Sequence, residues 1–84
     1  MKNMNWREAH LHDLDVQFGT SYEKHKGHDD DRQIFVKTYE QMVQGIKSLP
    51  EEPDLYVRVA MFKQLNEDKK RLWRIDCRFC NAED

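Results

Sequence analysis

Apolar and polar residues alternate over two stretches near the carboxyl end of the chain. The apolar positions of one parity are Leu55, Val57, Val59 and Met61 in the first stretch, and Trp73, Ile75, Cys77 and Phe79 in the second. Because successive side chains point to opposite faces of a β-strand, this pattern predicts strands over about residues 55–65 and 70–80. The polar residues NEDK between the two stretches predict a turn, and the strands then form a C-terminal β-hairpin.

The same parity sets the register of this hairpin. A slip of one residue would turn Ile75 from the apolar face into water, so Val57 is expected opposite Cys77. This register also places Arg58 opposite Asp76 on the other face, an ion pair that contributes about a few tenths of a kcal/mol.

Residues 31–48 carry the strongest helical pattern in the chain. The apolar residues at helical spacing are Phe35, Tyr39, Met42, Val43 and Ile46. The acidic run 29–31 is expected to cap the amino end, and Pro50 ends the helical geometry before it. Gly45 lowers helix propensity, which indicates a close approach to the sheet.

Two patterns compete in the first thirty residues. Asn5 followed three residues later by Glu8 resembles a capping box that opens a helix. An alternation typical of a strand follows, at Leu14, Val16 and Phe18. We expect a short helical or irregular segment over residues 6–10, a strand over residues 11–18, and a loop over residues 19–30.

These elements follow one another in the order strand, helix, strand, strand. The sequence therefore predicts a single α+β domain over residues 1–84, in which one helix packs on one face of a small, mainly antiparallel sheet. A chain of 84 residues is long enough to bury one core of this kind.

Charge and cysteine content narrow the classes of function. The 14 Lys and Arg and the 16 Asp and Glu leave a formal charge of -2. This balance speaks against a general nucleic-acid binder and against an acidic mimic of DNA. The sequence shows neither an apolar run of membrane-spanning length nor an apolar leader, so we expect no membrane association and a cytoplasmic location.

A zinc site is one candidate for chemistry. Two cysteines separated by two residues and two histidines around a glycine supply a Cys2His2 ligand set, at Cys77, Cys80, His25 and His28. The competing interpretation makes Cys77 a small apolar residue of the strand, whereas Cys80 lies on the opposite face at its end. A lone CxxC is a weak signal, so we expect no cofactor and keep zinc as the alternative.

The face of the hairpin turned away from the helix is the second candidate. It would gather aromatic and arginine side chains, at Tyr56, Arg58, Phe62, Arg74 and Arg78. These residue types are enriched at protein interfaces, and they also suit single-stranded nucleic acid, whose bases stack on rings and whose phosphates bind guanidinium groups. The near-neutral net charge favours a protein partner over nucleic acid.

No motif of a catalytic site is recognisable, so we expect a protein that is not an enzyme. The favoured hypothesis is a small binding protein that occludes a surface of a larger protein or nucleoprotein partner, as phage or mobile-element inhibitors of host defence enzymes do. The alternatives are a single-strand nucleic-acid-binding module and a small zinc-binding domain. An exposed aromatic face would also allow a homodimer.

Overall fold

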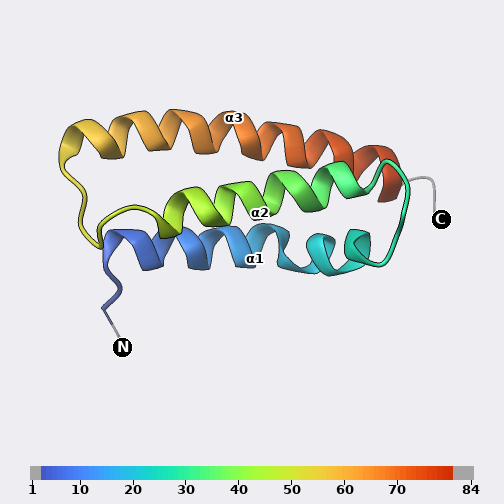
Figure 1. Ribbon diagram of the computed structural model, residues 1–84, viewed down its shortest axis with the longest axis horizontal. Coiled ribbons are helices and arrows are strands. Elements are labelled where there is room, and N and C mark those ends of the chain that lie inside the picture. The colour runs from blue at the N-terminus through green and yellow to red at the C-terminus, as the bar shows by residue number, and fades with distance from the viewer. Residues whose placement is uncertain (1–2, 81–84) are drawn as a thin grey trace.

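Helices are the only regular secondary structure in the described part of the chain. The computed structural model describes residues 3–80, and over this range it contains three α-helices and no strand. The helices are α1 (Trp6–Lys26), α2 (Gln33–Lys47) and α3 (Leu55–Cys80). They lie side by side and successive helices run in opposite directions, so α1 and α3 begin at the same end of the bundle (Figure 1). The predicted α+β fold with its sheet is therefore wrong.

The C-terminal β-hairpin is the largest error, because residues 55–80 form one continuous helix. No glycine or proline interrupts these residues, and the expected turn NEDK continues the helix. Leu65 and Leu72 are two helical turns apart and both are buried, whereas strand parity would place them on opposite faces. The proposed pairs of Val57 with Cys77 and of Arg58 with Asp76 are not formed, since their members lie far apart along one helix.

The strand predicted over residues 11–18 is also wrong. The helix opening predicted at Asn5 is present, because the Asn5 side chain accepts a hydrogen bond from the Glu8 backbone at 2.8 Å and donates one to the Glu8 carboxylate at 3.3 Å. The helix that begins here continues to Lys26. Val16 is exposed while Leu14 and Phe18 are buried, so the three do not share a face. The predicted loop over residues 19–30 is mostly the last two turns of the same helix.

The helix predicted over residues 31–48 corresponds to α2, which is Gln33–Lys47. Its amino end differs from the expected acidic cap, because the residue at the cap position is Arg32, whose side chain makes no capping hydrogen bond. The Asp30 carboxylate instead accepts a hydrogen bond from the Arg32 backbone at 3.0 Å, which stabilises the turn before the helix.

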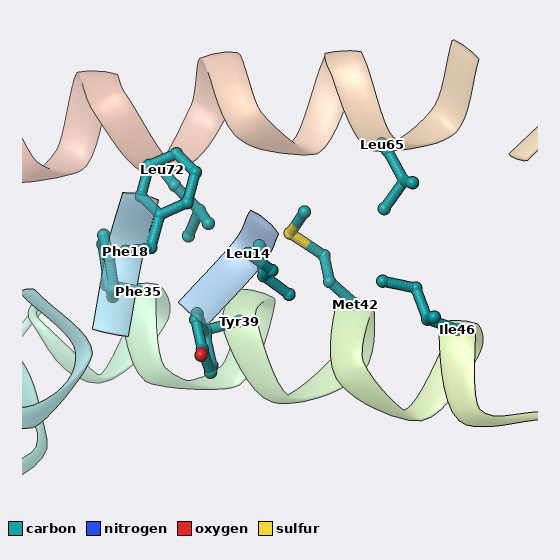
Figure 2. Packing of buried hydrophobic residues seen from close by; sticks show 8 residues of the cluster. All are labelled: Leu14, Phe18, Phe35, Tyr39, Met42, Ile46, Leu65 and Leu72. Carbon is teal, nitrogen blue, oxygen red and sulfur yellow. The ribbon is translucent and has the colours of Figure 1, made fainter. Parts of the chain in front are cut away.

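The core fills the space where the three helices face one another (Figure 2). Its members are Leu14 and Phe18 of α1, Phe35, Tyr39, Met42 and Ile46 of α2, and Leu65 and Leu72 of α3. Helix α2 contributes half of them, which explains why its apolar stripe was the clearest in the sequence. A Cβ atom at Gly45 would lie 3.4 Å from the Met61 methyl group, so the close approach expected there is to α3 and not to a sheet.

The length and apolar character of the helices determine whether any of them could cross a bilayer. Within residues 3–80, none combines sufficient length with sufficient apolar character to span a membrane.

Candidate docking surface

The start of α3 is fixed by hydrogen bonds from the segment before it. The Asp54 carboxylate accepts a hydrogen bond from the Val57 backbone at 3.0 Å and caps the helix. Arg58 donates to the Pro53 carbonyl at 2.6 Å and to the Glu52 carboxylate at 2.8 Å. These polar contacts help to hold the first turns of α3, while the apolar side chains on one side of these turns remain exposed.

Those apolar side chains form an exposed row, which we call the α3 stripe: Leu55, Val59 and Phe62. Their exposed fractions are 76%, 49% and 53%. The spacing i, i+4, i+7 places the three on one side of the helix over about two turns. Tyr56, which is 83% exposed, lies beside the α3 stripe. Exposed apolar residues scattered singly are ordinary, but a contiguous row of this kind is typical of interaction surfaces.

The surface around the α3 stripe is uneven. One shallow hollow lies between Tyr56, Val59 and Lys63. A second lies between Val59 and Phe62 on one side and Trp6 of α1 on the other. Side chains of a partner could therefore be received on both sides of the stripe.

The charge of the chain is unevenly divided between α3 and the remainder. Helix α3 carries seven Lys and Arg against three Asp and Glu, so its formal charge is +4 within a chain of charge -2. The exposed basic residues beyond the α3 stripe are Lys63, Lys70, Arg71, Arg74 and Arg78. The near-neutral net charge of the chain is the basis for preferring a protein partner over nucleic acid. It is the sum of a basic α3 and an acidic remainder of the chain.

The five residues predicted to share a partner-binding face do not lie on one face. Phe62 belongs to the α3 stripe and lines one hollow together with Arg58, whereas Tyr56 lines the other hollow. Arg58 turns toward α1, where its guanidinium lies 6.0 Å from the centre of the Trp6 ring. Arg74 and Arg78 are roughly 18 Å or more further along the helix, at 1.5 Å per residue.

The two histidines of the proposed zinc site are engaged in other contacts. Nε2 of His25 lies 3.1 Å from an Asp76 carboxylate oxygen, and a His28 ring nitrogen lies 2.7 Å from the Arg32 guanidinium. Cys77 is an exposed free thiol, and the side chain of Cys80 is outside the described residues. Over residues 3–80, no group of three or more His, Cys, Asp or Glu side chains is arranged to hold a metal ion. With Cys80 undescribed, the zinc site stays a prediction.

A partly buried polar cluster joins α1 to the carboxyl half of α3. His25 is only 1% exposed and packs against the Phe35 ring. Asp76 links it to Ser21, whose hydroxyl donates to the second carboxylate oxygen at 3.0 Å. The order of the three groups differs from that of a hydrolytic triad, where the histidine lies between the serine and the acid. Here Ser21 binds the acid directly, so the cluster connects helices and does not activate a nucleophile.

Known proteins do not identify a family for this chain. No family model, no curated protein and no solved structure matches this chain. The assignment of a function therefore rests on the surface described above.

The residues predicted to bind a partner include Phe62 of the α3 stripe and the nearby Tyr56, but not Leu55 and Val59. The alternating pattern predicts Leu55 and Val59 on the buried face of a strand, whereas both are exposed on the helix. Helical spacing of Leu55, Val59 and Phe62, together with the absence of glycine and proline after Pro53, was the signal that could have identified them.

Proposed function

We propose that the protein is a small binding protein that inserts the α3 stripe into an apolar groove on a larger protein and so occludes that surface. One observation carries the proposal: Leu55, Val59 and Phe62 are all about half exposed or more, at the i, i+4, i+7 spacing of helices that bind in grooves. Occupying such a groove blocks other ligands of the partner, which is how a small protein can act as an inhibitor.

The geometry of α3 supports this mode of binding. The capping by Asp54 and the two hydrogen bonds of Arg58 hold the helix in its bound shape beforehand, so little ordering would be required on binding. The exposed thiol of Cys77 is compatible with a reducing compartment. A cytoplasmic location is therefore part of the proposal.

Affinity capture with matched variants tests the proposal. Tagged wild-type protein, a Val59→Glu/Phe62→Glu variant and a Val16→Glu/Ile34→Glu control are used to capture proteins from a lysate of the source cells. Val16 and Ile34 are also exposed, at 67% and 53%, but lie outside the α3 stripe. We expect the wild type and the control to capture the same proteins and the stripe variant to lose them. Equal capture by all three would contradict the proposal.

A second candidate function is single-strand nucleic-acid binding by the basic part of α3. The charge of +4 on this helix favours it, although the sheet face on which bases were expected to stack does not exist. Fluorescence anisotropy with a labelled oligonucleotide at low salt would test it. Binding should weaken steeply as salt increases and should be lost in a Lys70→Glu/Arg74→Glu variant. A lack of binding at low salt would eliminate this function.

A further inference from the structure

Four exposed cations of α3 have no partner among the described residues. They are Lys63, Lys70, Arg71 and Arg74. Over residues 3–80, the side chains of these four form neither an ion pair nor a hydrogen bond. The neighbouring Lys69 differs, because its ammonium group lies 2.7 Å from an Asp13 carboxylate oxygen. The four cations are therefore available to anionic groups from outside the chain.

Three of the four cations form a line along α3, which we call the basic row: Lys63, Lys70 and Arg74. Seven residues are close to two helical turns and eleven are close to three, so the three side chains leave the same side of the helix. The row is about 16 Å long, at 1.5 Å per residue. Arg71 adds to the same surface, because it lines a polar hollow together with Lys70 and Arg74.

The basic row begins at the edge of the α3 stripe. Lys63 lines one hollow with Val59 and Phe62. It also lines the second hollow, beside Tyr56 and Val59. A partner that covers the α3 stripe therefore also meets the ammonium group of Lys63.

We propose that the partner carries an acidic surface directly beside the groove that receives the α3 stripe, and that Asp and Glu side chains of this surface bind the basic row. The inference rests on the docking role proposed above for the stripe. Carboxylates are the protein groups that pair with ammonium and guanidinium groups. Pairs of this kind at the rim of an interface increase the association rate and select the partner more than they add to affinity.

The size of a specific interface favours a contact that includes the basic row. The α3 stripe runs for about 10 Å along the helix, whereas Leu55 and Arg74 are about 29 Å apart along it. Each partner in a stable complex buries about 800 Å², which corresponds to a patch about 30 Å across. The stripe alone is shorter than such a patch, and the stripe together with the basic row has the length of one.

A protein surface suits the basic row better than a nucleic acid does. Glu67 is exposed and lies between Lys63 and Lys70 in the sequence. Glu67 and Asp68 also line the polar hollow beside Arg74. The uniformly charged phosphates of a nucleic acid would approach these carboxylates as well as the cations. A protein can place acidic side chains against the cations and neutral ones against the carboxylates.

Carbodiimide coupling of the captured complex tests the acidic surface. This reagent joins a lysine amine to a carboxylate where the two are in contact. The tagged full chain captures proteins from a nuclease-treated lysate of the source cells, and mass spectrometry identifies the coupled peptides. We expect Lys63 and Lys70 to be joined to Asp or Glu residues of a captured protein. Lys37 and Lys47, which are exposed on α2, should give few such bonds or none.

A matched pair of variants measures the effect of the basic row on binding. Lys63→Gln/Lys70→Gln and the control Lys37→Gln/Lys47→Gln each remove two exposed lysine charges, so the net charge is the same in both. Surface plasmon resonance measures their binding to the protein identified by coupling, at about 50 mM and about 500 mM salt. At low salt, the first variant should associate about three- to tenfold more slowly than the control. The difference should shrink at high salt, where the charges are screened.

Three results would overturn the acidic surface. The first is coupling that is absent at Lys63 and Lys70, or as frequent at the two lysines of α2. The second is an equal association rate for the two variants. The third is capture that disappears once nucleic acid is digested, because nucleic acid would then be the occupant of the basic row.

The docking role of the α3 stripe is decided separately. A captured protein that is lost with Val59→Glu/Phe62→Glu but bound equally by Lys63→Gln/Lys70→Gln and its control would support docking and overturn the acidic surface alone. A wild type that captures no protein would contradict the docking role, and the acidic surface would fail with it.

Discussion

The two halves of α3 use their apolar residues in different ways. In the carboxyl half, Leu72 is fully buried and Trp73 packs against Phe18 of α1, with ring centres 5.4 Å apart. Asp76 adds the partly buried bond to His25. In the amino half, Leu65 is buried in the core and Met61 packs against it, but the α3 stripe on another side of the helix is exposed.

Different residues of α3 therefore contribute to folding stability and to binding of a partner. Apolar area that is already buried contributes to folding, whereas exposed apolar area remains available to a partner. We therefore expect substitutions in the carboxyl half to change the free energy of unfolding, and substitutions in the α3 stripe to change association with little effect on folding.

The largest effect on stability should come from Leu72→Ala. Leu72 is 0% exposed, and such a truncation leaves a cavity and typically costs about 2–5 kcal/mol. Leu55→Ala is the matched control, because the same atoms are removed from an exposed position and the cost should stay below about 0.5 kcal/mol. Urea denaturation measures both. Similar losses in the two variants would contradict the division of α3.

Asp76→Ala should have an intermediate effect. It removes the partner of the buried His25 ring nitrogen and of the Ser21 hydroxyl, and a buried polar group without its partner costs about 1–3 kcal/mol. Glu67→Ala removes an exposed carboxylate from the same helix and serves as the control. The free energies of unfolding at neutral pH compare the two, and an Asp76→Ala variant as stable as the control would contradict a supporting role for the cluster.

The smallest effect concerns the ion pair between α1 and α3. Lys69 donates a hydrogen bond of 2.7 Å to Asp13, and this bond lowers the pKa of the Asp13 carboxyl below its ordinary value of 3.8. A lowered folded-state pKa contributes stability that is present above pH 3.8 and is lost as pH falls through the folded-state pKa. NMR titration of the Asp13 carboxyl carbon should show the lowered pKa, and Lys69→Met should return it toward 3.8. A titration unaffected by Lys69→Met would show that the bond is not formed in solution.

How far the sequence predicts the fold depends on how many apolar stripes a helix carries. Helix α2 has its buried residues on a continuous helical stripe, and its position was predicted to within two residues at each end. In α1, the exposed Val16 lies between the buried Leu14 and Phe18 in the sequence. These three apolar residues alternate with polar ones, so this segment of the helix has the pattern of a strand.

Helix α3 explains the larger error. Val57 and Met61 are partly buried while Leu55 and Val59 are exposed, so two apolar stripes lie on different sides of the helix. Read along the chain, these two stripes place an apolar residue at every second position and imitate a strand. The feature that misled the prediction of the fold is therefore the exposed stripe that we propose as the docking surface.

A photo-crosslinking amino acid placed at position 59 tests the central claim most directly, because it captures the partner whatever its identity. Position 16, which is also an exposed valine, is the control. Irradiation of cells that produce the two variants should give covalent adducts to another protein or to a second copy from position 59, and few or none from position 16. Equal adducts from both positions, or none from position 59, would contradict the claim that the amino half of α3 is a docking surface.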